Sequence, residues 1–312
     1  MSKHGRTGLV SIVSGLPLPV IPASITNDEE IYLRQLHQYL QRLSTAFNQD
    51  NVAGTIGYPD TPQDTRDYHL FYDSSEADAE WRIVNQSIQV DNDAEYVDVG
   101  TMTGLTAGND LTFECWYRVA SGFGTRRVLA GWTSGADFVQ FIDEGNGVFS
   151  VWYDRSTVIT KAVVSSAVSY EDKKWHHIVM CIDPGTGAKI YFDGAVQSVT
   201  SSTSNSTSST AWSVFGASMY LGRMNGGTAY NAQGYLDEVA IYPDELTVAE
   251  IASHYSFGLN GSKEDYKTLI LSHSPFAYWG LDETSGTIAY DDSGNSRNGT
   301  YSGVTLQQAG VL

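Results

Sequence analysis

The residues best suited to metal chemistry form a short acidic run ahead of a predicted strand. Asp91-Asn92-Asp93 places three side chains with oxygen ligands just before Tyr96–Val99. Such oxygens are the ligands that Ca²⁺ takes, in sets of about six to eight. The same residue types also close turns by bonding to their own backbone. A candidate calcium site and an ordinary polar turn are therefore the two interpretations.

Three aromatic residues, Trp132, Trp152 and Tyr153, are the candidates for ligand binding. They lie near the ends of predicted strands, and the last two precede Asp154 and Arg155. Ligand sites combine apolar and aromatic surface with a few polar groups that fix orientation, as stacking on a sugar ring would require. The core of a β-sandwich also contains aromatic residues. The alternative for each of the three rings is therefore that it is buried in the core.

Residues that could perform catalysis are less well arranged. Asp237 and Glu238 are adjacent in a predicted strand, where successive side chains point to opposite faces. We therefore expect them not to form the carboxylate pair that glycoside hydrolysis needs. His176 and His177 lie in a strand-like run, and no Gly-x-Ser-x-Gly sequence occurs. These patterns predict structural histidines and no enzymatic activity.

The elements that must position these residues are short strands joined by turns. Asp193-Gly194, between two apolar runs, is typical of a type I′ hairpin, and Thr247 begins a capping box that predicts a closing helix. Regularly spaced strands without intervening helices indicate an antiparallel sandwich. The predicted strands are Trp81–Val84, Ser87–Val90, Tyr96–Val99, Leu111–Val119, Arg127–Trp132, Asp137–Ile142, Val148–Tyr153, Val158–Val164, Trp175–Ile182, Ala188–Phe192, Tyr220–Arg223 and Gly234–Tyr242.

The composition excludes one class of partner. The 312 residues include 18 Lys and Arg against 36 Asp and Glu, a formal net charge of -18. An acidic surface repels phosphates, which excludes a nucleic-acid binder that works through a broad basic face. No apolar run approaches the roughly 20 residues of a membrane span. Cys115 and Cys181 are too few for a disulfide scaffold and are predicted to be buried free thiols.

The N-terminal part has a different organisation. Pro-rich residues 1–26 predict an extended anchoring arm, residues 27–50 a capped amphipathic helix, and residues 51–85 a linker. A seam with heptad spacing predicts a short coiled coil that holds several chains together, the alternative being a helix packed on its own domain. The seam consists of Leu33, Leu36, Leu40, Leu43 and Phe47.

Three stretches together resemble the laminin-G-like, concanavalin A-type jelly-roll domains. They are Phe-Glu-Cys-Trp at 113–116, Trp-His-His-Ile-Val at 175–179 with Lys-Ile-Tyr-Phe-Asp-Gly at 189–194, and Tyr-Leu-Gly-Arg at 220–223 leading to Gly234–Tyr242. The resemblance covers about residues 86–257. It implies a mainly β fold, an antiparallel jelly-roll sandwich, preceded here by the arm and the short helix. It implies no single function, since this fold hosts lectins, adhesion modules and hydrolases.

The resemblance also adds expectations about sites. Some laminin-G-like domains hold Ca²⁺ at the acidic turn, which implies that Asp91 and Asp93 are joined by Asp237. Jelly-roll glucanases carry a Glu-x-Asp-x-x-Glu pattern that is absent here, which supports a non-catalytic protein. Residues 275–312 resemble the opening of a second, partial domain after a predicted linker at 258–274. They either begin a further repeat or supply strand pairings that the first domain lacks.

The order of arm, helix and laminin-G-like module is similar to that of bacteriophage virion proteins. It implies a non-catalytic structural or adhesion protein, a capsid fibre, decoration or tail-associated appendage. The arm would bind capsid or tail proteins, and the module would face a surface glycan or protein of the host. Such fibres are usually three-fold, which implies a homotrimer located in the virion or otherwise outside cells. A secreted bacterial carbohydrate-binding lectin is the alternative, and a polysaccharide hydrolase is the third possibility.

Overall fold

The structure is a computed structural model, and it describes the chain from residue 68 onward. The described residues are 68–73, 78–83, 85–105, 110–120, 126–134, 137–145, 147–155, 158–164, 170, 172–183, 187–204, 217–224 and 230–312. The predicted arm and the predicted helix, with its seam from Leu33 to Phe47, lie outside these residues and stay predictions. The chain divides into two compact units, residues 1–82 and 83–312.

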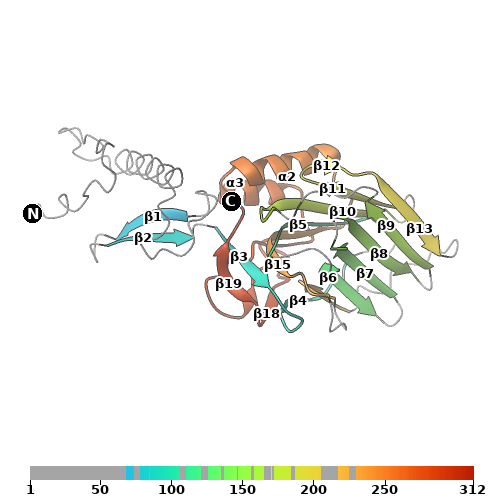
Figure 1. Cartoon of the computed structure of the whole chain (residues 1–312), viewed down its shortest axis with the longest axis horizontal. Coiled ribbons are helices and arrows are strands. Elements are labelled where there is room, and N and C mark those ends of the chain that lie inside the picture. Colours follow the sequence, from blue (N-terminus) through green and yellow to red (C-terminus); the bar gives the residue numbers. More distant parts are fainter. Residues whose placement is uncertain are drawn as a thin grey trace, which may run out of the picture. The chain divides into compact units, whose positions relative to one another are not determined.

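The strand pair β1 (Tyr68–Asp73) and β2 (Asp78–Ile83) falls in the predicted linker 51–85. The remaining described strands form two antiparallel sheets of a sandwich (Figure 1), which confirms the predicted fold class. The eight-stranded sheet has the order β12-β11-β10-β5-β15-β3-β19, with β16 also paired to β15, and the nine-stranded sheet has the order β13-β9-β8-β7-β6-β14-β4-β18-β17. The strand bounds are β3 (Gln86–Val90), β4 (Tyr96–Thr101), β5 (Leu111–Val119), β6 (Arg127–Ser134), β7 (Asp137–Asp143), β8 (Phe149–Arg155), β9 (Val158–Val164), β10 (His176–Asp183), β11 (Gly187–Phe192), β12 (Ala195–Val196), β13 (Val199–Ser204), β14 (Ser218–Leu221), β15 (Gly234–Tyr242), β16 (Ala277–Trp279), β17 (Ile288–Ala289), β18 (Gly299–Ser302) and β19 (Thr305–Ala309).

The main hydrophobic core lies between the two sheets. Alternate residues of each strand point into it, as the period of two requires, and Phe113 of β5 stacks on Phe141 of β7 with ring centroids 4.5 Å apart. Cys115 lies in this core and Cys181 in a second cluster on the other side of the eight-stranded sheet. Both thiols are free and buried, as predicted.

Two helices cover the outer side of the eight-stranded sheet. Figure 1 shows α2 (Val248–Asn260) and α3 (Lys263–Ser272) together above β10 and β11. The capping box at Thr247 is confirmed, with Glu250 as its partner. Residues 258–274, predicted to be a linker, instead hold the end of α2 and all of α3. Tyr266 and Ile270, four residues apart, form the buried stripe of α3. Within the described residues, neither helix has the length and apolar character that crossing a membrane requires.

The C-terminal segment contributes strands to both sheets. β16 pairs with β15, β18 with β4, and β19 with β3, all antiparallel. Trp279 and Ala289 of this segment lie in the core between the sheets, and Val311 packs in the cluster beneath the helices. Of the two possibilities for residues 275–312, the structure therefore shows the second, in which they supply pairings for the same sandwich.

Candidate functional site

A row of residues crosses the outer side of the nine-stranded sheet, the side turned away from the core. Strand pairing aligns Trp152 with Gln140, Gln140 with Gly131, Gly131 with Tyr220, and Tyr220 with Asp98. We call these five residues the sheet row. The residues directly before and after each of them lie in the core between the sheets, so strand alternation puts the row on the outer side.

Trp152 is held in place by hydrogen bonds and by a cation. Its Nε1 donates to Ser150 Oγ at 2.9 Å and to Glu144 Oε1 at 3.1 Å. The Arg126 guanidinium lies 4.6 Å from the centre of the Trp152 ring and forms an ion pair with Glu144 at 2.9 Å. Arg126 also lies 5.7 Å from the ring of Tyr230, which is 51% exposed. The result is a half-buried, fixed indole beside polar groups that could bond to a ligand.

Tyr220 has a comparable environment near the other end of the row, next to Asp98. Its ring stacks on Tyr96 with centroids 4.4 Å apart, and Arg223 lies over both rings at 5.3 and 4.2 Å. Partial burial, together with the charge of Asp98, raises the pKa of the Tyr220 hydroxyl, which keeps it protonated and able to donate. Arg223 is fixed by donating to the Asp93 carbonyl oxygen. Two arginine–aromatic groups therefore flank the middle of the row.

The structure places the predicted ligand-binding aromatics on different sides of the sheet. Trp132 is fully buried and Tyr153 is 5% exposed, both in the core between the sheets. They are core aromatics, as the alternative interpretation had it, because their strand positions point inward. Of the three candidates, Trp152 alone lies on the outer side. The sequence did not single out Tyr220, because its place opposite Trp152 depends on the strand order.

The predicted calcium ligands each have a different partner. Asp91 accepts from Gln89 Nε2, Asp93 from Asn231 Nδ2, and the fully buried Asp237 from Asn85 Nδ2 and from the Val311 amide. In the part of the chain that the structure describes, no group of three or more His, Cys, Asp or Glu side chains is arranged to hold a metal ion. The implied set of Asp91, Asp93 and Asp237 is therefore not assembled, and calcium binding stays a prediction.

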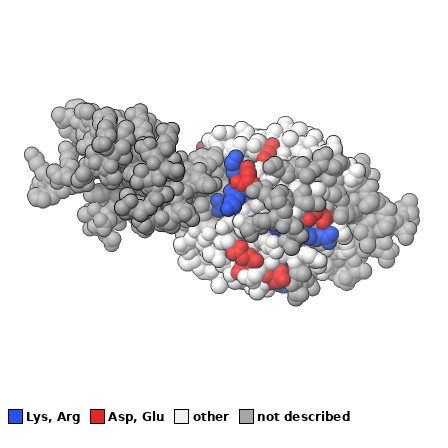
Figure 2. All heavy atoms as spheres, in the orientation of Figure 1, with Lys and Arg blue, Asp and Glu red and all other residues white. Residues whose placement is uncertain are grey.

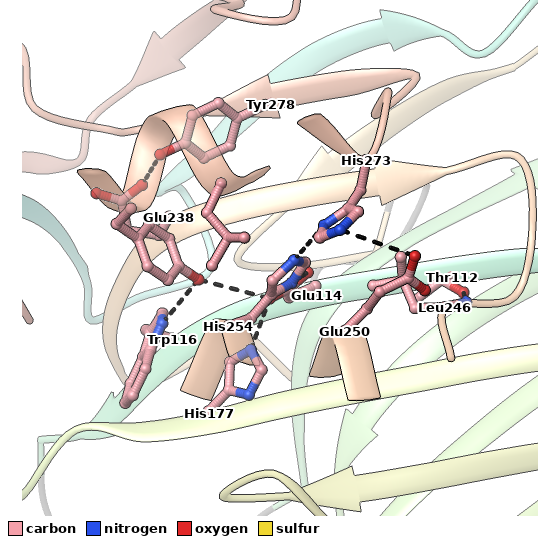
Figure 3. Close-up of polar contacts among 12 residues, drawn as sticks. Thr112, Glu114, Trp116, His177, Glu238, Leu246, Glu250, His254, His273 and Tyr278 are labelled. Atoms are coloured by element: carbon pink, nitrogen blue, oxygen red, sulfur yellow. Dashed lines mark hydrogen bonds and ion pairs between the residues drawn. The ribbon is translucent and has the colours of Figure 1, made fainter. Parts of the chain in front are cut away.

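A second polar cluster lies beneath the helices, on the outer side of the eight-stranded sheet (Figure 3). Glu114 of β5 is fully buried and accepts from His177 Nε2 at 2.6 Å and from His254 Nδ1 at 2.9 Å. His254 Nε2 lies 2.8 Å from His273 Nδ1, and His273 Nε2 lies 3.8 Å from Glu250 Oε1. We call Glu114, His254, His273 and Glu250 the Glu114 chain.

The charges in the Glu114 chain stabilise one another. Burial acts to raise the pKa of Glu114, but the charge of His254 and the hydrogen bonds from both histidines outweigh it, so the pKa falls well below its usual range. Burial acts to lower the pKa of His254, yet the nearby Glu114 carboxylate raises it. His176 and His177 are both bonded to carboxylates, which agrees with their predicted structural roles.

The neighbouring carboxylates Asp237 and Glu238 correct one expectation. They were expected on opposite faces, but β15 has a β-bulge here, with Glu238 at φ 50°, and a bulge breaks the alternation. Asp237 bonds to the Val311 amide and Glu238 to the Tyr278 hydroxyl, and both partners belong to the cluster beneath the helices. Burial raises the pKa of Glu238 to about 7. Both carboxylates therefore lie on the helix side, fully covered.

The face of the molecule that Figure 2 shows has no broad charged area among its described residues. On the side that Figure 2 shows, the described Asp, Glu, Lys and Arg side chains lie in small separate groups among neutral residues. Charged side chains of the domain also form ion pairs, as Lys189 does with Glu245 at 2.6 Å. The sheet row has the same character, since Arg126 pairs with Glu144 next to Trp152. Recognition there would depend on aromatic faces and hydrogen bonds more than on net charge.

Comparison with known proteins gives one family and several similar folds. Residues 91–252, just over half of the chain, match the family model of the concanavalin A-like lectin/glucanases superfamily. No curated protein matches the sequence. A solved structure of a Bacteroides ovatus protein, proposed to bind carbohydrate, is 18% identical with a TM-score of 0.49, and the match covers 72% of this chain and 60% of that one.

Two further solved structures have lower scores. The CBM40 of the Ruminococcus gnavus IT-sialidase is 12% identical with a TM-score of 0.41, covering 54% of this chain and 96% of that one. Mouse laminin α1 domains LG4-5 are 13% identical with a TM-score of 0.41, covering 54% and 44%. At these identities the similarity concerns the fold alone.

Proposed function

Since the chain belongs to the concanavalin A-like lectin/glucanases superfamily over residues 91–252, we propose that it is a carbohydrate-binding module without catalytic activity. The glycan would lie across the sheet row, on the outer side of the nine-stranded sheet. The proposal therefore follows the lectin alternative of the sequence analysis and not the virion appendage. The observation that carries the proposal is the alignment of Trp152 and Tyr220 across neighbouring strands, with polar residues between and beside them.

The dimensions of the row suit a sugar chain. Trp152 and Tyr220 are three strand spacings apart, about 14 Å at roughly 4.8 Å per strand, which is more than one sugar ring spans. Gly131 in the middle has no side chain, a Cβ there would lie 2.9 Å from the Val139 carbonyl oxygen, and its backbone forms a β-bridge with Met224. Gln140, whose amide nitrogen donates to Met224 Sδ, lies between the two rings, and Asp98 lies beyond Tyr220. The row therefore presents aromatic and polar groups in turn, which matches an alternately apolar and polar ligand.

The buried carboxylates support the absence of catalysis in this proposal. Glu114, Asp237 and Glu238 are all fully buried beneath the helices and the C-terminal residues. Each already bonds to protein groups, Glu114 to two histidines and Glu238 to Tyr278. A hydrolase needs its acid and its nucleophile beside the glycosidic bond, and these residues have no such access. The proposed location is extracellular, where free glycans and surface glycans are met.

Binding of the full chain to a glycan array, followed by calorimetry on the hits, tests the proposal. Trp152→Ala and Tyr220→Ala should each weaken binding at least tenfold, which corresponds to about 1.4 kcal/mol. Phe257→Ala is the matched control, because this ring is 42% exposed on α2, over the other sheet. Full binding by both row variants, or no glycan bound by the native chain, would refute the proposed function.

The virion appendage, its capsid or tail partners and the trimer stay predictions. They rest on the arm and the helix, which lie outside the described residues. A glycan site on the sheet row is compatible with that role as well as with a secreted lectin. Loss of glycan binding in a row variant would not distinguish a virion appendage from a secreted lectin. Glycan binding and the location of the protein therefore need separate experiments.

A further inference from the structure

The Glu114 chain allows its protons to be counted. A carboxylate only accepts hydrogen bonds and an imidazole nitrogen either donates or accepts. His254 Nδ1 must therefore donate to Glu114, and one shared proton must lie between His254 Nε2 and His273 Nδ1, 2.8 Å apart. Because the Glu114 carboxylate raises the pKa of His254, we assign both ring protons to His254, so that His254 Nε2 donates to His273 Nδ1 and the proton of a neutral His273 lies on Nε2, 3.8 Å from Glu250 Oε1. Three protons on two rings give the pair a single positive charge between two carboxylates.

We propose that the Glu114 chain is a proton-operated switch that fixes α2 and α3 to the eight-stranded sheet near neutral pH and frees α3 in mild acid. A fourth proton would place an N–H on His254 against an N–H on His273, because the imidazolium ion has two donors and no acceptor. The contact between the two rings then becomes repulsive. This contact joins α2 to His273, the residue that ends α3.

Within the Glu114 chain, imidazole is the type of side chain whose charge changes between pH 5 and pH 8, while Glu238, outside this chain on β15, has its pKa raised by burial to about 7 and takes up a proton in the same range. Glu114 has its pKa held well below its usual range by His254 and His177, so it stays ionised in mild acid. Burial acts to raise the pKa of Glu250, but its hydrogen bonds to Thr247 and the charges of the two histidines together outweigh burial and lower it. The titratable groups that face the two rings are Glu114 of β5, Tyr242 of β15, Glu250 of α2 and Tyr266 of α3, and His177 of β10 contacts Glu114 from its other side.

Position decides which element is released first. Glu114 keeps His254, and with it α2, on the sheet as long as the carboxylate is ionised. His273 is 21% exposed and accessible to solvent protons. α3 keeps its Tyr266 and Ile270 packing but loses the bond at its C-terminal end. The structure therefore assigns the acid-sensitive step to α3 and not to the whole domain.

Hydrogen exchange on the full chain, corrected for the intrinsic pH dependence of exchange, tests this. Protection factors of amides in α3 should fall at least tenfold between pH 7 and pH 5, while those of β5 and β10 change less than twofold. In His273→Gln the side-chain oxygen can still accept from His254 Nε2 and cannot take up a proton. That variant should keep α3 protected at pH 5 to within twofold of pH 7.

His176→Gln is the matched control, since His176 bonds to Asp193 and Asp172 and lies outside the chain. It should show the same acid response of α3 as the native protein. Urea unfolding at both pH values verifies that each variant is folded. Unchanged protection of α3 at pH 5, an equal loss in His273→Gln, or a response removed by His176→Gln would each overturn the proposal.

Discussion

Replacing Glu114 by Gln removes one negative charge from the interior with almost no change of shape. The native carboxylate is fully buried and accepts hydrogen bonds from His177 at 2.6 Å and from His254 at 2.9 Å. Gln has one acceptor oxygen and an amide group that donates. The amide would therefore face a histidine N–H in at least one of the two contacts, and the charge that stabilises His254 would be lost.

The size of the effect follows from these contacts. A hydrogen bond to a charged group contributes roughly 1.5–3 kcal/mol, and removing one partner of a buried ion pair costs about 3–5 kcal/mol. We therefore expect Glu114→Gln to lower the free energy of unfolding at pH 7 by about 3 to 5 kcal/mol. Glu264→Gln, on the exposed side of α3, is the matched control, and its change should stay within about 0.5 kcal/mol.

The difference between native protein and variant should also depend on pH. The folded pKa of Glu114 lies below its ordinary value of 4.5, so its contribution is complete above pH 4.5 and is lost as the pH falls through the folded value. His254 has a folded pKa above its ordinary 6.5, so its contribution is present below pH 6.5 and is lost as the pH rises through the raised value. Urea unfolding followed by circular dichroism should show the largest difference between these limits. A difference under about 1 kcal/mol, or one that is the same at every pH, would refute the reasoning.

Two further predictions concern calcium and assembly. If the acidic turn with Asp91 and Asp93 binds Ca²⁺ in the native state alone, a hundredfold excess of Ca²⁺ over Kd raises the free energy of unfolding by about 2.7 kcal/mol. The melting midpoint should then be higher in millimolar calcium than in EDTA, whereas equal midpoints would show an ordinary polar turn. If the seam joins chains, Leu36, Leu40 and Leu43 replaced together by Ser should give monomers with intact β structure by light scattering and circular dichroism, and a native protein already monomeric at micromolar concentration contradicts the seam.

The parts of the fold that local sequence determines were predictable. Alternation along Leu111–Val119 predicted a strand, Gly234–Tyr242 was predicted as another, and the structure contains both with the same bounds as β5 and β15. The capping box at Thr247 gave the start of α2. In these places propensity, hydrophobic period and turn residues all favour the same element, so no distant contact is needed to decide it.

The parts that depend on distant contacts were not predictable in the same way. α3 was missed because its apolar stripe is short and its burial comes from packing on the sheet. The bulge at Glu238 inserts one residue into a pattern that otherwise alternates. Glu114 contacts His177 and His254, which are 63 and 140 positions away in the sequence. Nothing in the local sequence around Glu114 indicates which histidines it contacts.

The two outer surfaces of the sandwich differ in how far their polar and aromatic side chains are covered. The eight-stranded sheet carries the carboxylates that could do acid–base chemistry, but α2, α3 and the C-terminal residues cover them, and every one is bonded to a protein group. The outer side of the nine-stranded sheet carries half-buried aromatic rings whose orientation is fixed by Glu144 and by arginine. A buried charge stabilises the domain only while it keeps its partners, whereas a half-buried ring can still bury more surface against a ligand. Strand alternation therefore places buried, paired charges on one outer surface and half-buried rings on the other, which is the surface that our proposal assigns to glycan recognition.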